Sequence, residues 1–437
     1  MKIEKFRLEN VGPFSSLSVS LAPNVTVLIG NNGAGKTTVL QALATSLSWF
    51  VGRFRSEKGS GSPIDEEQIF NGANSAAIAV EVRDQDNIYE WSVAKVRAGR
   101  KGAHTSQLNN ASRLADVYRT ALSTDEQTSV PLIAFYPVER VVLDIPLKIS
   151  EKHSFQQLDG YDNSLNQGVD FRRFFEWFRE REDAENENSI PKDILNEIEE
   201  KFGEAMWELL EARGISAKDR QLTAVRTAIA NFMPGFSNLK VRRKPKLHMS
   251  IDKGLQTLNV SQLSQGEKSL MALVGDIARR LAMMNPGLTN PLHGEGVVLI
   301  DEVDMHLHPR WARDIIQRLT VTFPNCQFIL TTYSPLVISD CKDVLVYALE
   351  DGHLTAVPPL YGQDVNTVLL DVMDTHIRNA VVAKHLNDLL DLIHDRHLDQ
   401  AKELISELEK DLHAQNLELA KARLLLRKEE MRLAKNP

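Results

Sequence analysis

Nine consecutive residues constrain the fold of this chain more than any other feature, because they join an apolar strand to a helix. They are Gly30, Asn31, Asn32, Gly33, Ala34, Gly35, Lys36, Thr37 and Thr38. Glycines at this spacing let successive backbone N–H groups turn inward around the phosphates of a nucleotide, and the helix N-terminus adds positive charge. Lys36 is placed to meet the β- and γ-phosphate oxygens, and Thr37 to bind Mg²⁺. The loop predicts an α/β fold that binds ATP with Mg²⁺.

Two carboxylates follow a second apolar strand, residues 297–300. Asp301 is suited to hold magnesium through water, and Glu302 is placed to accept a proton from the water that attacks the γ-phosphate. An apolar strand followed by a charged turn is common, so the acidic pair indicates a catalytic site only in combination with the phosphate loop. Together with Lys36, these residues predict hydrolysis of the bound ATP.

A third motif, Leu-Ser-Gln-Gly-Glu-Lys-Ser at residues 263–269, opens a helix upstream of that pair. Ser264 with Glu267 three residues later is the pattern of a capping box. A helix N-terminus with a serine hydroxyl and the open backbone of Gly266 is also an anion site. The two interpretations are compatible.

Composition excludes several classes of protein. The chain has 437 residues with 51 Lys+Arg against 59 Asp+Glu, a net charge of −8, so any contact with nucleic acid needs a local basic patch. Neither Cys326 nor Cys341 lies in a CxxC pattern, which argues against structural zinc and disulfides and fits a reducing cytoplasm. No signal-peptide pattern and no apolar run of ~18 residues occurs, so we expect a soluble cytoplasmic protein without a membrane partner.

Periodicity divides the chain into four predicted parts. Residues 1–150 form a strand-rich lobe that carries the phosphate loop, with a solvated loop and one short helix expected over 98–128. Residues 151–235 form a helical insertion, with helical stretches at 170–183, 192–210 and 218–233. Residues 236–375 form a second lobe that contains the other two motifs. Residues 376–437 are almost unbroken helix.

The order of these motifs resembles the ABC-type ATPase heads of the SMC, Rad50, RecF and OLD-like branch, which also have a TTxSP segment like that at residues 331–335. The resemblance implies an α/β, ABC-type (P-loop NTPase) ATPase head with a helical insertion and a C-terminal helical region. It also implies a homodimer or higher oligomer in which two heads meet head to tail. In that dimer Ser264, Gln265, Gly266 and Glu267 of one subunit close over the γ-phosphate held by the other.

Two positions depart from that family or match it loosely. The family usually has histidine as the switch residue near the γ-phosphate, where this chain has Tyr333. With a pKa near 10, a tyrosine hydroxyl donates a hydrogen bond but cannot become a cation, so we expect Tyr333 to support slow hydrolysis. Gln68 is the candidate for the glutamine that contacts the metal. For His306 and His308 we favour a dimer-facing or structural role over metal binding.

A narrower resemblance, to the PtuA family of Septu and Septu-like retron anti-phage systems, extends across nearly the whole chain. It rests on FRLENVGPF, FYPVER, LSQGEKS, DEVDMHLHP, TTYSP and the leucine-rich helical tail. It implies a sensor and regulator that holds a PtuB-like HNH nuclease in check. In retron systems it also implies a reverse transcriptase and its msDNA, an RNA-linked single-stranded DNA, as partners.

Two basic clusters and one apolar stripe are candidates for partner contacts. The clusters are Lys95, Arg97, Arg100 and Lys101, and Lys240, Arg242, Arg243, Lys244 and Lys246. Each cluster contacts nucleic acid or is simply solvated surface charge. The C-terminal helices that carry the stripe through Leu404, Leu408 and Leu412 pack on the head or on each other, or they dock the nuclease. We expect a dock, because a short tail cannot bury the stripe alone.

Three other functions use similar motifs. A RecF- or Rad50-like DNA repair or recombination ATPase has the same head chemistry and remains the alternative. An OLD nuclease requires a Toprim domain, but the residues after Tyr333 are predicted to be helical. A transporter subunit is disfavoured by the LSQGE and HLHP segments and by the helical tail.

Overall fold

The computed structural model describes residues 1–138, 155–166, 169, 171–188, 218–339, 341–373, 379–413 and 416–435. Contacts divide the chain into two compact units, Met1–Val365 and Asn366–Pro437. The helical stretch predicted at 192–210 lies outside the described residues.

An antiparallel sheet opens unit 1. Its strands are β1 (Lys2–Val11), β2 (Phe14–Ser20), β4 (Ser75–Asp84) and β5 (Asn87–Val96), in the order β2-β1-β4-β5. Buried and exposed residues alternate along much of these strands, so one face of the sheet covers the core. The hairpin predicted around residues 76–96 is confirmed by the pairing of β4 with β5.

A helix of 16 residues, α2 (Asn109–Thr124), occupies most of the segment predicted to be a solvated loop with one short helix. That expectation was wrong for these residues. Ala111, Leu114 and Ala115 are buried at spacings of three and four, and α2 packs on α1 and β5. The polar residues between them, which suggested a loop, form the exposed face of the helix.

A six-stranded sheet forms the centre of unit 1, in the order β13-β12-β3-β11-β10-β6. Its strands are β3 (Val25–Gly30), β6 (Leu132–Tyr136), β10 (Gly296–Ile300), β11 (Cys326–Thr331), β12 (Leu345–Glu350) and β13 (His353–Ala356). All neighbours from β12 to β6 pair in parallel, and only β13 is antiparallel. Strands β6, β10 and β11 are buried throughout, as central parallel strands are. Because β3, β11 and β10 are neighbours, their C-terminal ends meet at one edge.

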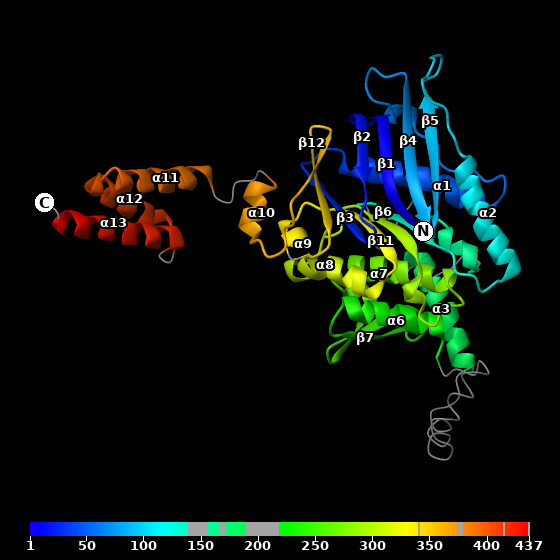
Figure 1. Cartoon of the computed structure of the whole chain (residues 1–437). Coiled ribbons are helices and arrows are strands. Elements are labelled where there is room, and N and C mark those ends of the chain that lie inside the picture. Colours follow the sequence, from blue (N-terminus) through cyan, green and yellow to red (C-terminus); the bar gives the residue numbers. More distant parts are fainter. Residues whose placement is uncertain are drawn as a thin grey trace. The chain divides into compact units, whose positions relative to one another are not determined.

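Helices cover this sheet on both sides. α1 (Lys36–Arg55) contacts β3, β10 and β11, while α7 (Gln265–Met284) contacts β6 and packs on α6 (Arg220–Phe232). α8 (Pro309–Thr322) and α9 (Pro335–Ser339) follow β10 and β11. In Figure 1 the antiparallel sheet stands at the top of unit 1, with β3, β6 and β11 below it and α7, α8 and α6 lower still. Short 3-10 turns lie at Glu66–Gln68, Gln157–Tyr161, Val260–Gln262 and Pro291–His293.

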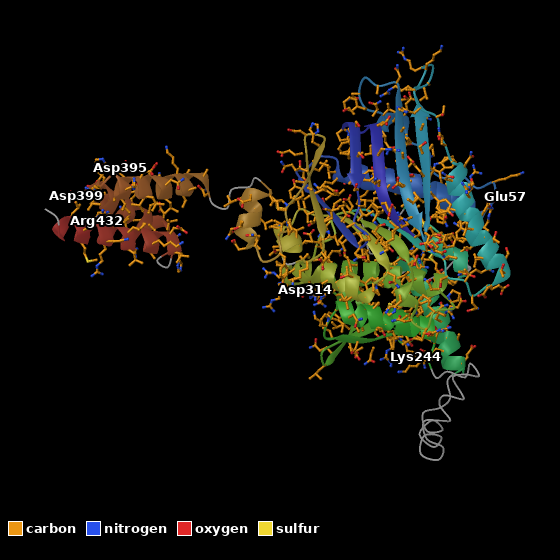
Figure 2. All side chains as sticks on the ribbon, in the orientation of Figure 1. Glu57, Lys244, Asp314, Asp395, Asp399 and Arg432 are labelled. Atoms are coloured by element: carbon orange, nitrogen blue, oxygen red, sulfur yellow. The ribbon has the colours of Figure 1, made fainter. Side chains whose placement is uncertain are left out.

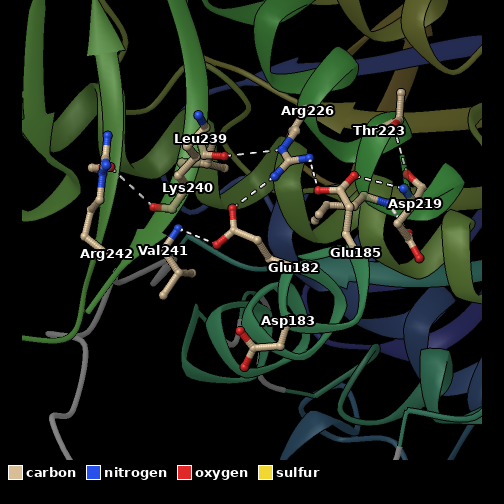
Figure 3. Close-up of polar contacts among 12 residues, drawn as sticks. Glu182, Asp183, Glu185, Asp219, Thr223, Arg226, Leu239, Lys240, Val241 and Arg242 are labelled. Atoms are coloured by element: carbon tan, nitrogen blue, oxygen red, sulfur yellow. Dashed lines mark hydrogen bonds and ion pairs between the residues drawn. The ribbon is translucent and has the colours of Figure 1, made fainter. Parts of the chain in front are cut away.

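The described helices of the predicted insertion are anchored to the second lobe. α3 (Phe171–Asn188) packs near a small antiparallel sheet of β7 (Phe236–Arg242), β8 (His248–Lys253) and β9 (Gln256–Asn259). Arg226 on α6 forms ion pairs with Glu182 at 3.0 Å and Glu185 at 2.8 Å. Glu182 also accepts the N–H of Val241 on β7 at 2.8 Å, so one carboxylate ties three elements together (Figure 3).

Unit 2 is a set of helices with a core of its own. After α10 (Val365–Asp371) come α11 (Ala380–His394), α12 (Leu398–Asp411) and α13 (Leu417–Lys435), so the tail is not the almost unbroken helix that was predicted. The last three share a cluster of buried residues: Leu386, Leu389, Ile393, Ala401, Ile405, Leu408, Leu419, Ala422 and Leu426.

This cluster corrects the interpretation of the leucine stripe. Leu408 belongs to the cluster, and Leu404 and Leu412 pack against it. The expectation that the tail cannot bury these leucines was wrong, because α11 and α13 cover them. Of the helices in the described ranges, none is long and apolar enough to cross a membrane.

Candidate nucleotide site

The phosphate loop, the acidic pair and Tyr333 meet where β3, β10 and β11 end. The phosphate loop follows β3, the acidic pair follows β10, and Tyr333 lies just after β11, between them. Residues far apart in the sequence are therefore neighbours because of the strand order.

The turn into α1 depends on glycine. Gly35 precedes the helix with φ 102°, a left-handed conformation that other residues rarely adopt. A Cβ at this position would lie 2.6 Å from the ring of Phe14. The preceding turn is closed by the N–H of Ala34, which donates to the carbonyl of Asn31 at 3.1 Å. Both conformation and packing therefore require glycine at position 35.

Lys36 lies at the centre of the site and is buried. Its Nζ donates to the carbonyl oxygens of Gly30 at 2.7 Å and Asn31 at 3.2 Å, within the phosphate loop. Burial lowers the pKa of Lys36, while Glu302 and Asp301 act against that shift. The ammonium is thus held at the inner face of the loop, the position from which a lysine contacts phosphate oxygens.

Two of the predicted magnesium ligands, Thr37 and Asp301, contact each other. The hydroxyl of Thr37 donates to Oδ2 of Asp301 at 2.7 Å. A hydroxyl and a carboxylate are oxygen ligands of the kind that Mg²⁺ prefers. The donor set therefore fits a magnesium ion that also contacts nucleotide phosphates.

Glu302 occupies an unusual backbone conformation. Its φ is 45°, in the left-handed region, and its N–H donates to the hydroxyl of Thr331 at 2.7 Å. Non-glycine residues in this region persist where neighbouring groups hold them, and they are frequent at functional sites. The charge of Glu302 raises the pKa of Lys36. The Glu302 carboxylate therefore lies close enough to the phosphate loop to interact with its lysine.

The motif at residues 263–269 forms the predicted capping box. The hydroxyl of Ser264 accepts the N–H of Glu267 at 3.3 Å, and the Glu267 carboxylate accepts the N–H of Ser264 at 2.8 Å. Glu267 also pairs with Lys253 at 2.7 Å. A Cβ on Gly266 would lie 2.2 Å from the carbonyl oxygen of His306, so the turn that follows the acidic pair packs directly on this helix N-terminus. Gln265 is the first residue of α7.

Gln68 is placed near the phosphate loop but is engaged in its own turn. Its side-chain oxygen accepts the N–H of Asp65 at 3.2 Å, and its backbone carbonyl accepts the N–H of Gly12 at 2.7 Å. Gly12 in turn lies against Thr38. The structure thus connects Gln68 to the start of α1 through backbone contacts, and the side-chain oxygen of Gln68 is bonded to Asp65.

The other predicted candidates have structural contacts. His308 caps α8 by accepting the N–H of Arg310 at Nδ1 (3.3 Å). No group of three or more potential metal-binding side chains occurs within the described ranges. In the first basic cluster, Arg97 donates to the carbonyls of Ala73 and Ile69. In the second, Arg243 pairs with Asp183, whereas Lys244 is exposed and marks the lower edge of unit 1 in Figure 2.

Sequence reasoning missed two residues that organise the site. The Thr331 hydroxyl contacts both members of the acidic pair. Tyr136, at the end of β6, accepts the N–H of Asp301 on its carbonyl at 2.9 Å and donates its hydroxyl to Asp276 of α7, also at 2.9 Å. The FYPVER and TTYSP segments contained both residues, but only the strand order shows what they contact.

The fold and this arrangement define an ABC-type P-loop ATPase. Residues 5–205 match the family model described as "AAA domain", and residues 125–339 match "AAA domain, putative AbiEii toxin, Type IV TA system". The chain is 35% identical over 397 residues to "Retron Ec83 probable ATPase" of Escherichia coli, which covers 82% of this chain and 73% of that relative. It is 35% identical over 369 residues to "Retron Vc95 probable ATPase" of Vibrio cholerae serotype O1 biovar El Tor. That match covers 77% of this chain and 72% of the relative. The chain belongs to the family of retron ATPases.

More distant similarities extend along the chain. "Septu protein PtuA" of Bacillus thuringiensis is 23% identical over 418 residues, with coverage of 95% of this chain and 90% of that protein. Among solved structures, an SMC head bound to the C-terminal winged-helix domain of ScpA matches with a TM-score of 0.46 and 16% identity. The match covers 82% of this chain and 97% of the SMC head. The family models and the retron and Septu relatives confirm the predicted fold class, the ATPase activity and the resemblance to retron and Septu ATPases.

Proposed function

We propose that this protein is the ATP-binding and ATP-hydrolysing sensor and regulator of an anti-phage defence complex in the cytoplasm. In that complex it controls a PtuB-like HNH nuclease and works with a retron reverse transcriptase and its msDNA. The observation that carries the proposal is the assembled ATPase site in a chain similar to retron ATPases over most of its length.

The residues of the site have separate roles in this proposal. The loop from Gly30 to Thr38 binds the phosphates, with Lys36 at the β- and γ-phosphates. Thr37 and Asp301 hold Mg²⁺, which neutralises phosphate charge when bound. Glu302 accepts the proton of the attacking water. Tyr333 donates a hydrogen bond near the γ-phosphate.

The active form in this proposal is a homodimer with shared sites. Ser264 accepts a backbone N–H through its oxygen, which leaves its hydroxyl proton for another acceptor. Together with the N–H groups of the first turn of α7, that proton is suited to an oxyanion. Ser264, Gln265, Gly266 and Glu267 would then close on the γ-phosphate bound by the second copy.

The outer face of α13 is the surface we assign to the nuclease. Leu417, Leu424 and Met431 repeat every seven residues and are 65%, 69% and 55% exposed. Arg427 and Lys428 are exposed beside them. An amphipathic surface of this kind suits an apolar partner surface with acidic flanks. This assignment replaces the inner stripe of Leu404, Leu408 and Leu412.

A second copy is a poorer occupant of this face. Two α13 helices packed antiparallel about Leu424 would bring Lys421 of one copy next to Arg427 of the other, and like charges repel. Acidic side chains also occur on the other helices of the unit, such as Asp395 and Asp399 at the α11–α12 turn, at the same end as Arg432 of α13 (Figure 2).

The test is reconstitution with the PtuB-like HNH nuclease that this proposal requires. We expect the nuclease bound to the ATPase with Mg-ATP to cut plasmid DNA at least tenfold more slowly than the free nuclease. Lys36→Ala should lift that suppression, and Lys58→Ala, at an exposed lysine, should not. Equal cleavage rates for the free and bound nuclease would exclude the proposed regulation.

A RecF-like role in DNA repair is the second candidate. "DNA replication and repair protein RecF" of Agathobacter rectalis is 26% identical over 170 residues, although this covers only 38% of the chain. ATP turnover that DNA stimulates in the absence of any nuclease would favour it.

A further inference from the structure

The end of β11 is bound residue by residue to the turn that carries the acidic pair. The hydroxyl of Thr331 donates to Oδ1 of Asp301 and accepts the N–H of Glu302 at 2.7 Å. The carbonyl of Thr331 accepts the N–H of Val303 at 2.9 Å. Thr331 therefore contacts three consecutive residues of the turn.

The hydrogen-bonding capacity of Thr331 is matched to these contacts. A threonine hydroxyl has one proton to donate and lone pairs to accept, and here the proton goes to a carboxylate and a lone pair to a backbone N–H. Thr331 is fully buried, so water cannot replace either bond. Without the hydroxyl, the N–H of Glu302 loses its acceptor and one oxygen of Asp301 loses a donor.

The hydrogen bonds of Thr331 continue a chain of hydrogen bonds that begins at Thr37 in the phosphate loop. Oδ2 of Asp301 accepts from Thr37 at 2.7 Å, so the two oxygens of one carboxylate are held by hydroxyls from two different elements. The second hydroxyl also holds the left-handed backbone of Glu302, whose φ is 45°. The orientation of the carboxylate and the conformation of the next residue thus depend on one side chain.

We propose that Thr331 is a positioning residue for ATP hydrolysis. It orients the Asp301 carboxylate toward the metal and holds the Glu302 backbone so that the Glu302 carboxylate meets the attacking water. This inference rests on the proposed roles of Asp301 and Glu302. Thr331 itself contacts neither nucleotide nor water in this mechanism.

The test compares three variants with the wild type. Thr331→Val keeps the shape and removes the hydroxyl, while Thr331→Ser keeps the hydroxyl. Thr26→Val is the matched control, because Thr26 is an equally buried threonine on β3 whose hydroxyl accepts the N–H of Ala22 at 2.9 Å, at the opposite end of the strand.

We expect Thr331→Val to lower kcat about 10- to 100-fold, since a misplacement of about 1 Å in a catalytic group has effects of that size. The Kd for ATP without metal should stay within twofold, and the Mg²⁺ concentration for half-maximal turnover should rise. Thr331→Ser should recover turnover to within threefold of the wild type, and Thr26→Val should match the wild type.

Three results would overturn the inference. They are normal turnover by Thr331→Val, a serine variant as slow as the valine variant, or an equal loss in Thr26→Val. If Thr331→Val does not fold, as judged by its melting curve, Thr331→Ala is measured in its place against the same criteria. Normal turnover by Glu302→Gln would instead reject the proposed catalytic role of Glu302, so the two failures are distinguishable.

Discussion

The ammonium nitrogen of Lys36 lies 4.4 Å from the centre of the Tyr333 ring. A cation within about 6 Å of an aromatic face is attracted to the ring. Tyr333 therefore interacts with the phosphate-loop lysine through its ring, in addition to any hydrogen bond that its hydroxyl makes. A histidine at this position could also gain a proton near neutral pH and become a cation, which the tyrosine cannot do.

Tyr333 should limit the rate of hydrolysis. We expect Tyr333→His to raise kcat by tenfold or more, because imidazole titrates near neutral pH. Tyr333→Phe keeps the ring beside Lys36 and should lower kcat without weakening ATP binding. Steady-state ATPase assays measure both. A fast wild type that Tyr333→Phe leaves unchanged would exclude a role for the hydroxyl.

Lys36→Ala should weaken ATP binding at least tenfold, because a charged partner of the β- and γ-phosphates is lost. Isothermal titration with Mg-ATP compares it with the wild type and with Lys58→Ala. An unchanged Kd in Lys36→Ala would contradict the assignment of the phosphate loop.

Glu302→Gln should trap an ATP-bound dimer, since glutamine keeps the size of the side chain but cannot accept the proton. Ser264→Arg should block closure of the dimer. Mixed with Lys36→Ala, Ser264→Arg should regain turnover, because one of the two shared sites then contains only intact residues. Light scattering with ATP measures the dimer, and a mixture no more active than either variant alone argues against shared sites.

Local sequence patterns predicted the parts of the site that are continuous in the chain. The phosphate loop after β3, the acidic pair after β10 and the capping box of α7 each follow from a few neighbouring residues. The contacts of Thr331 and Tyr136 were not predictable, because they depend on which strands are neighbours in the sheet. For the same reason the stripe at Leu408 suggested an external partner, although other helices of the tail cover it.

The buried group of Asp276, Arg279, Arg280 and Tyr136 should make stability depend on pH. Burial raises the pKa of Asp276, but Arg280 and Arg279 outweigh it, and the net pKa lies below the usual value. Its stabilising contribution is therefore present above the pKa of the unfolded state, about 3.9, and is lost as the pH falls through the lower folded value.

Asp276→Asn should cost about 3–5 kcal/mol, because two buried arginines lose their counter-charge. Tyr136→Phe should cost about 1 kcal/mol. Urea unfolding between pH 3 and 7 tests both, and the acid-dependent loss should be smaller in Asp276→Asn. Equal pH profiles would show that Asp276 does not contribute to this dependence.

Removal of unit 2 should separate ATP binding from partner binding. Residues 1–365 contain every nucleotide motif and should bind Mg-ATP as the full chain does. In the full chain, Leu424→Glu should abolish co-purification of the nuclease, while Val381→Glu, at an exposed position on α11, should not. Nuclease retained by residues 1–365 would move the docking surface to unit 1.

The buried apolar cluster of unit 2 consists of residues from α11, α12 and α13, and the outer face of α13 takes no part in it. Substitutions on the outer face of α13 can therefore accumulate without disturbing the chemistry at Lys36. Recombination near residue 366, where the two units divide, would exchange unit 2 and leave the nucleotide motifs intact. Under the proposed function, such an exchange would change the partner nuclease and keep the response to ATP.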